Sequence, residues 1–354
     1  MSDWPTRRFM ELFHVELPIA LAPMAGFGTV ELAIAAARAG ALAAIPCATI
    51  SLDDADRQVA AFRTCGRPIN VNFFCHASPA STDDSAWRAR LAPLYAELGA
   101  TAAGTGVDRR PFDDAACAWL ERVKPEVASF HFGLPAAELL ARVKATGAKI
   151  VSSATTVREA VWLAAHGCDA IIAQGAEAGG HRGMFLTDDA SAQPGTFALV
   201  PQICDAVRVP VIAAGGIADG RGIAAAFALG AVGVQIGTAY LACPEAKVSA
   251  IHRRALADAT DESTVITNVL TGRPARGIAN RAIRELGPLD AAAPPFPLAA
   301  AALAPLRAVA EAHGSGDFTN LWAGQAARLA RAGEPAEALT QRLARDALER
   351  LAML

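Results

Sequence analysis

The residue types best suited to chemistry are concentrated in residues 170–183, AIIAQGAEAGGHRG. The apolar run 170–173 is typical of a buried strand, and Gln174 follows it directly. The loop beyond contains one histidine, His181, and glycines at positions 175, 179, 180 and 183. Because imidazole titrates near neutral pH, His181 could accept a proton from a carbon acid or, when protonated, bind an anion. The glycines would let the loop fold closely over a ligand.

A second histidine in a position suited to chemistry is His131, in the run SFHFGLP at residues 129–135. It also follows an expected strand. It could act beside His181, or it could be a core histidine hydrogen-bonded to a neighbouring carbonyl group. We expect Glu177 and Arg182 to orient the His181 loop and not to react.

Two further glycine-containing segments indicate an anion site. Gly215 and Gly216 lie in AAGGIADGRG, residues 213–222, and Gly237 and Thr238 end the run QIGT. Glycines let backbone N–H groups approach an anion closely, and a following helix N-terminus favours negative charge. The alternative is that these glycines only form tight strand-to-helix turns. We favour a phosphate site, to which Thr238 could add a hydroxyl donor.

Amide side chains indicate which kind of phosphorylated molecule would bind at this site. Asn72, Gln174 and Gln235 can each donate and accept hydrogen bonds, which suits a heteroaromatic ring with alternating N–H and C=O groups. LAPMAG, residues 21–26, adds Pro23 and Met24 at the end of the first expected strand. Paired carboxylates, a metal-ligand cluster and a lysine nucleophile are missing from the strand ends, which argues against a hydrolase, a metal site or Schiff-base chemistry. Flavin mononucleotide (FMN) fits this set.

Strand-like runs and helical patterns alternate regularly along the chain, and these elements must position the residues described above. Helical patterns such as 29–40, 156–167 and 219–230 separate short apolar runs. Eight such strand-like runs occur, at residues 18–22, 41–45, 68–74, 127–132, 149–153, 170–174, 210–214 and 233–237. Apolar strands that alternate with helices favour a parallel sheet, and eight units favour an α/β fold of the (β/α)8 TIM-barrel type. In that fold, functional groups lie at the C-terminal ends of the strands.

The alternation predicts three parts. Residues 1–244 would form the (β/α)8 FMN-binding barrel, with space for an extra helical pair in residues 75–126. Residues 245–317 would form a small, mostly helical lid over the mouth of the barrel. Residues 318–354 would contribute C-terminal helices that return to the barrel wall.

Composition narrows the class of protein. Hydrophobic residues make up 53% of the 354 residues, the formal net charge is −3, and no Lys/Arg block is present, which argues against nucleic-acid binding. Seven scattered cysteines without a C-x-x-C pair suit a reducing cytoplasm, and the first 18 residues contain no apolar signal core. Residues 222–244 carry no charge and are long enough to span a bilayer, but their internal glycines divide them into shorter elements. We therefore expect a cytoplasmic protein without a membrane span.

Three motifs in order, LAPMAG, DAIIAQGAEAGGHRG and PVIAAGGIADGRGIAAAFALGAVGVQIGT, resemble the nitronate monooxygenases, formerly called 2-nitropropane dioxygenases. The resemblance is strong from Pro18 to about Cys243. It implies a TIM barrel that binds FMN without a metal and denitrifies alkyl nitronates with O2 after one-electron transfer to the flavin. It implies His181, and with it His131, as active-site histidines. The expected FMN contacts are Ala22, Pro23, Met24, Asn72, Gln174, Gly179, Gly180, Gly215, Gly216, Gln235, Ile236, Gly237 and Thr238. The expected partners are a nitronate or similar small molecule and O2, with a homodimer possible.

Two other functions remain open. The first is an FMN-dependent NAD(P)H:quinone or enoyl-thioester reductase on the same barrel, although no G-x-G-x-x-G follows a first strand. The second is a flavin-free barrel that acts on a phosphorylated sugar or nucleotide. The chain also departs from the resembled family, whose members often place tyrosines and a lysine over the flavin from the segment near residues 296–307. This chain has neither there, which predicts a wider or more apolar mouth.

Overall fold

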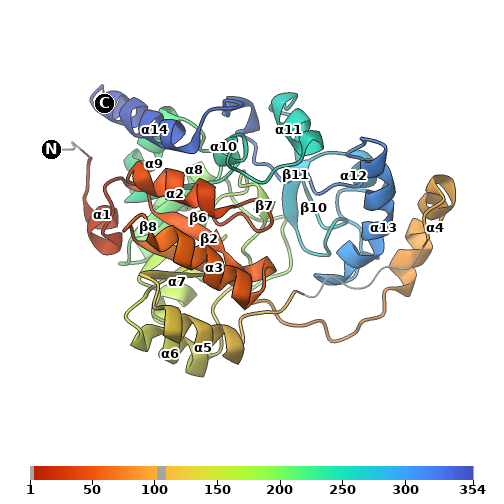
Figure 1. Ribbon diagram of the computed structural model, residues 1–354, viewed down its shortest axis with the longest axis horizontal. Helices are drawn as coiled ribbons and strands as arrows, with labels where there is room; N and C mark the ends of the chain where they lie inside the picture. The colour runs from red at the N-terminus through yellow and green to blue at the C-terminus, as the bar shows by residue number, and fades with distance from the viewer. Residues whose placement is uncertain (1–3, 102–108, 354) are drawn as a thin grey trace.

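A parallel eight-stranded barrel forms the centre of the molecule (Figure 1). The computed structural model describes residues 4–101 and 109–353. The barrel strands are β1 (Ile19–Leu21), β2 (Ala43–Pro46), β3 (Ile69–Phe74), β4 (Val127–His131), β5 (Lys149–Ala154), β6 (Ala170–Gln174), β8 (Val211–Ala214) and β9 (Gly233–Ile236). Their order is β1-β9-β8-β6-β5-β4-β3-β2. Backbone hydrogen bonds of 2.9 Å, from Leu21 N to Leu42 O and from Leu42 N to Ile19 O, connect the two ends. The predicted (β/α)8 barrel is confirmed, and each strand lies within two residues of its predicted range.

The bottom of the barrel is closed by the helix α1 (Arg8–Phe13). Phe9 and Phe13 pack edge to face, 4.8 Å apart between ring centroids, against residues at the N-terminal ends of the strands. A Cβ atom on Gly233 would lie 2.5 Å from the Phe9 ring, so α1 can close the barrel only if this position is glycine. Because apolar side chains fill this end, the opposite end is the one open to a ligand.

Helices cover the outside of the barrel. They are α2 (Val30–Arg38), α3 (Leu52–Arg63), α5 (Asp114–Val123), α6 (Ala137–Ala145), α7 (Val157–Ala165), α8 (Thr196–Ala206) and α9 (Gly220–Ala228). Short 3-10 helices occur at Cys47–Thr49 and Ala327–Leu329. Side chains of Thr29, Ser51, Asp113, Thr156 and Asp219 accept hydrogen bonds from the first-turn N–H groups of the helices that they precede. These N-caps fix where several helices begin, and so limit the length of the loops at the strand ends.

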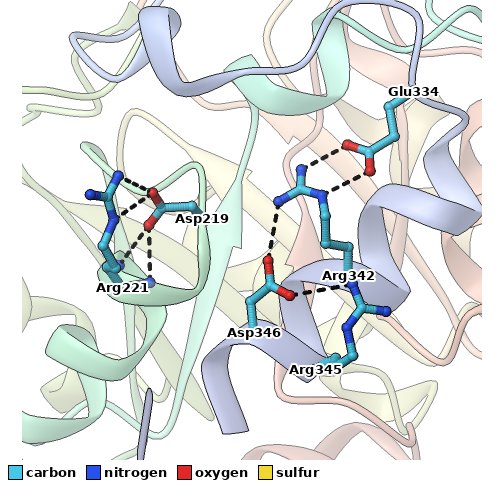
Figure 2. Close-up of polar contacts among 7 residues, drawn as sticks. Asp219, Arg221, Glu334, Arg342, Arg345 and Asp346 are labelled. Atoms are coloured by element: carbon cyan, nitrogen blue, oxygen red, sulfur yellow. Dashed lines mark hydrogen bonds and ion pairs between the residues drawn. The ribbon is translucent and has the colours of Figure 1, made fainter. Parts of the chain in front are cut away.

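The last helix, α14 (Ala336–Leu351), packs against α9 and α2 (Figure 1). Figure 2 shows its Arg342 between Glu334, 2.7 Å away, and Asp346, 3.5 Å away. A Cβ atom on Gly220 would lie 2.4 Å from the carbonyl carbon of Asp346, so glycine there permits close contact between α9 and α14.

A second hydrophobic core lies beside the barrel. It is formed by α4 (Ser85–Leu98), α12 (Arg281–Leu286) and α13 (Leu298–Ala312), with Trp87, Leu303 and Phe318 among its buried side chains. The helical pair expected in residues 75–126 is therefore divided: α5 covers the barrel, and α4 packs against α13 (Figure 1). The helices α10 (Thr238–Leu241) and α11 (Ala250–Ala257) contribute instead to a separate small cluster with Ala323 and Ala327.

A three-stranded antiparallel sheet connects this region to the barrel. Its order is β10-β11-β7, with β10 (Thr264–Thr267), β11 (Ala275–Ile278) and β7 (Gly180–His181). His181 pairs with Ala275, so the loop after β6 is held by residues from the C-terminal part of the chain. Residues 245–317 contain the helices α11 (Ala250–Ala257), α12 and α13 and the strands β10 and β11, and the two strands were not foreseen. Across the described ranges, no helix is long and apolar enough to cross a membrane; residues 222–244 form most of α9, all of β9 and α10.

Candidate active site

A cavity of about 730 Å³ opens at the C-terminal ends of the barrel strands. This volume lies within the range of small-molecule and cofactor sites. The sequence-predicted residues that line it are His131, His181, Ala22, Pro23, Met24, Asn72, Gln174, Gly179, Gly180, Gly215, Gly216, Gln235, Gly237 and Thr238. Ile236 differs, because its side chain is buried in the core between the barrel and its helices. The dispersed motifs therefore meet at one cavity.

The glycine segments form a cradle of backbone N–H groups. Gly215 and Gly216 have φ angles of +108° and +73°, which favour glycine. Within the described part of the chain, the N–H groups of Gly215, Gly216 and Gly237 make no hydrogen bond. Thr238 Oγ1 accepts a hydrogen bond from Gly324 N at 2.9 Å, so its own proton remains available to a ligand. Unpaired donors of this kind suit a phosphate.

Gly179 allows two backbone segments to meet at the edge of this cradle. A Cβ atom there would lie 2.5 Å from Gly324 N and 2.6 Å from the carbonyl carbon of Ala323. A side chain would therefore push the His181 loop away from residues 323–324. The sequence indicated a tight loop here, but not its partner.

The three amide side chains have different roles. Gln174 donates from Nε2 to the His181 carbonyl oxygen at 3.0 Å and accepts from Gly183 N at 2.7 Å, so its carboxamide holds the loop. Asn72 donates from Nδ2 to Ser129 Oγ at 2.9 Å. The carboxamide of Gln235 has no hydrogen bond to any residue that the structure describes. Gln235 is thus the amide most available to a ligand, and Gln174 also positions His181.

His181 is an uncharged imidazole in a partly buried position. Its Nε2 lies 2.9 Å from Thr271 Oγ1, whereas Nδ1 has no partner among the described residues. Burial holds the pKa of His181 well below its ordinary range, and the nearby Arg109 cation lowers that pKa further. The ring is therefore neutral near pH 7, which argues against an imidazolium that would pair with an anion.

His131 acts on the backbone of the same loop. Burial lowers its pKa to about 4, so the ring is neutral. Its Nε2 donates to the His181 carbonyl oxygen at 3.2 Å, and its Nδ1 accepts from Ser153 Oγ at 3.1 Å. Both ring nitrogens are occupied, and the carbonyl of His181 receives hydrogen bonds from both His131 and Gln174. This geometry suits a positioning role better than proton transfer to a ligand.

Aromatic side chains surround His181. Ring centroids of Phe296, Trp322, Phe132 and Phe74 lie 5.2, 5.5, 5.9 and 6.5 Å from its own. Phe296 begins the segment 296–307, from which the resembled family often contributes polar side chains. Its ring packs against His181, whereas Arg307, at the other end of this segment, lines the cavity. The wider or more apolar mouth stays a prediction.

The cavity also contains unpaired cations that the sequence reasoning missed. Arg109 and Arg307 line it, and neither forms an ion pair with a described residue. Nε of Arg109 is buried without a partner, and burial together with Arg307 lowers the Arg109 pKa. Lys247 is a third cation on the wall, against two carboxylates: Glu177, which accepts from Thr196 at 2.8–2.9 Å, and Glu311, which accepts from Thr319 at 2.8 Å. The cavity thus favours an anion.

No local sequence signal marks these cations or Thr271, because each reaches the cavity from a distant segment. The nearest local sign is the TGRPARG run at 271–277, which places a hydroxyl group and two arginines shortly after the β-branched run TVIT at 264–267.

Comparisons with known proteins agree with this site. A family model described as nitronate monooxygenase matches residues 6–346. A nitronate monooxygenase from Paraburkholderia phytofirmans is 41% identical over 351 residues, covering 96% of this chain and 95% of that protein. One from Pseudomonas aeruginosa is 40% identical over 354 residues, with coverage of 94% and 97%.

Two solved structures are also similar. A nitroalkane oxidase from Streptomyces ansochromogenes has a TM-score of 0.89 and 38% identity, covering 98% of this chain and 100% of that chain. FabK from Thermotoga maritima has a TM-score of 0.75 and 28% identity, with coverage of 98% and 97%.

The barrel and its cavity are those of a flavin-dependent oxidoreductase. The matches extend over nearly the whole chain at up to 41% identity. The chain belongs to the nitronate monooxygenase family.

Proposed function

We propose that the cavity binds FMN and that the protein oxidises alkyl nitronates with O2. The observation that carries this proposal is that two kinds of binding group line the same cavity. Unpaired N–H groups of Gly215, Gly216 and Gly237 share it with a neutral His181 whose Nδ1 is free. A phosphate and a small anion could therefore bind in the same space.

The residues present fit FMN. The glycine cradle and the Thr238 hydroxyl offer donors without charge, which suits a phosphate group next to a helix start. Gln235 offers a free carboxamide to the edge of a ring. Ala22, Pro23 and Met24 line the same cavity and could pack against the isoalloxazine. We include Gly179 and Gly180 among the contacts, whereas Ile236 could contribute only through its backbone.

Bound FMN would supply the redox chemistry, accepting electrons from the substrate one at a time and passing them on to O2. The side chains of this chain would bind and orient the nitronate. Arg109 and Arg307 would raise the local concentration of the anion. Phe74, Phe132 and Phe296 would exclude water from the reacting groups.

The hydrogen bond between Thr271 and His181 would set the imidazole tautomer. Thr271 Oγ1 lies 2.9 Å from His181 Nε2 and donates its proton to the Arg273 carbonyl oxygen at 3.4 Å. Both hydrogen bonds form together when Nε2–H of His181 donates to Thr271 Oγ1. Nδ1 then carries a lone pair, which could accept a proton from a carbon acid.

The test is steady-state oxygen consumption by FMN-loaded protein supplied with alkyl nitronates. We expect saturable O2 uptake with formation of a carbonyl compound and nitrogen oxyanions. The absence of turnover would reject the proposal. A cytoplasmic location and a possible homodimer remain predictions.

A second candidate is an NAD(P)H-dependent flavin reductase with a quinone or enoyl thioester as acceptor. The structural likeness to FabK over 98% of this chain favours keeping it, because one scaffold can serve both reactions. Rapid bleaching of the flavin by NADH in the absence of O2 would support it.

A further inference from the structure

Glu159, on α7, is a fully buried carboxylate without a cationic partner. Its exposed fraction is 0%, and it forms no ion pair within the described ranges. Oε2 accepts hydrogen bonds of 2.7 Å from both N and Oγ1 of Thr155. Oε1 accepts from Phe185 N at 2.7 Å and from Leu186 N at 3.2 Å. Four donors thus converge on this carboxylate, which compensates for its burial.

A chain of hydrogen bonds leads from Glu159 to the residue after His181. The Thr155 hydroxyl donates to Glu159, so it accepts from Gln193 Nε2, at 2.9 Å. Gln193 Oε1 accepts from Arg182 Nε at 2.6 Å. Each hydrogen bond in this series therefore has only one possible direction, because an arginine side chain can only donate and a carboxylate can only accept.

Arg182 connects this series of hydrogen bonds to the loop that carries His181. It is fully buried and donates to the carbonyl oxygens of Gln174 and Gly175, at 2.6 and 2.7 Å. Gln174 in turn donates to the His181 carbonyl group. The guanidinium forms no ion pair with a residue in the described ranges, and Glu159 and Glu177 are the acidic groups whose charge supports it.

The network therefore holds the loop on both sides of the reactive ring. One branch fixes Arg182, directly after His181, and the other fixes the backbone of Phe185 and Leu186. We propose that Glu159 is a positioning residue for His181, which acts through this hydrogen-bond network and not by contact with substrate. Its effect on turnover rests on the proposed function, whereas its effect on the loop does not.

The direct test replaces Glu159 with glutamine. The carboxamide would direct an N–H group at donors, at Thr155 or at the Phe185 and Leu186 amides, so that one branch must open. The matched control is Glu138→Gln, on the exposed surface of α6, where no polar contact is made by the side chain. Both variants are prepared as FMN-loaded protein, and flavin content and thermal unfolding are measured first.

Two readouts separate positioning from a general loss of stability. Hydrogen–deuterium exchange should accelerate in peptides covering residues 179–187 of Glu159→Gln, with peptides from β1 and β2 unchanged. With a nitronate substrate, kcat/KM should fall about tenfold in Glu159→Gln, but by less than about twofold when the same change is made in a His181→Asn background. Glu138→Gln should resemble the unsubstituted protein in both measurements.

The proposal is overturned if exchange in residues 179–187 is unchanged, or if the two substitutions lower kcat/KM independently. If Glu159→Gln does not fold, Thr155→Val removes the hydroxyl that links Glu159 to Gln193 but keeps the hydrogen bond from Thr155 N to Glu159, and it must give the same local exchange and the same non-additivity. If the unsubstituted protein does not oxidise nitronates, the proposed function fails, while the exchange measurement still decides whether Glu159 positions the loop.

Discussion

Thr271→Val isolates the contact that sets the His181 tautomer. The side chain is 2% exposed, and valine has nearly the same shape, so the main change is loss of the hydroxyl 2.9 Å from Nε2. A hydrogen bond of this kind contributes about 0.5–1.5 kcal/mol net. If it is needed in the transition state, kcat/KM for an alkyl nitronate should fall about 2-fold to 13-fold. Thr271→Ser retains the hydroxyl and should recover most of the loss.

The assay is the initial rate of O2 consumption over a range of nitronate concentrations, normalised to bound flavin. Thr267→Val is the matched control, because Thr267 is also buried in this segment but its hydroxyl contacts only Val269 N, at 3.2 Å. If Thr271→Val has the kcat/KM of the unsubstituted protein, the hydroxyl of Thr271 has no part in turnover. The same conclusion follows if the serine variant is as impaired as the valine variant, or if the control loses as much.

Further expectations concern the cofactor, the substrate and pH. Gly179→Ala should weaken FMN binding about tenfold or more in a fluorescence titration, because its Cβ atom would meet Gly324 N at 2.5 Å; an unchanged Kd would contradict the assigned cradle. His181→Asn should retain FMN but lower kcat about 100-fold, and unchanged kinetics would remove His181 from the mechanism. Arg307→Ala should raise KM for a nitronate about threefold with little change in kcat, an effect that added salt should mimic in the unsubstituted protein. Burial lowers the pKa of His252 to about 4, so the unfolded chain binds a proton on this ring at a higher pH than the folded protein does. The free energy of unfolding should therefore fall as the pH decreases from about 6.5 to 4. Denaturant titrations that show no change over this interval would contradict the assignment.

The barrel could be predicted because each strand carries its own local signal. A continuous apolar run such as 170–174 is buried on both faces, and glycines follow at the point where the chain must turn. The rule that parallel strands point their C-terminal ends to one rim then brings Gly216, Thr238 and His181 together without any knowledge of distances.

The remaining features depend on contacts between distant segments, which carry no local signal. Thr271 reaches His181 only because β11 pairs with β7 across 90 or more residues. The segment containing α4 has the pattern of an ordinary helix, and nothing in it indicates that it packs against α13. Gln174 could be placed at a strand end, but its carboxamide is engaged by the loop that follows, which only the folded backbone reveals.

The most direct test of the proposed function is anaerobic mixing of the flavin-loaded protein with an alkyl nitronate, and separately with NADH, while flavin absorbance is recorded. With the nitronate, we expect rapid loss of the oxidised flavin spectrum and its return when O2 is admitted; with NADH, we expect slow or no change. Rapid bleaching by NADH with no response to the nitronate would contradict the proposed function, and would assign the cavity to a reductase.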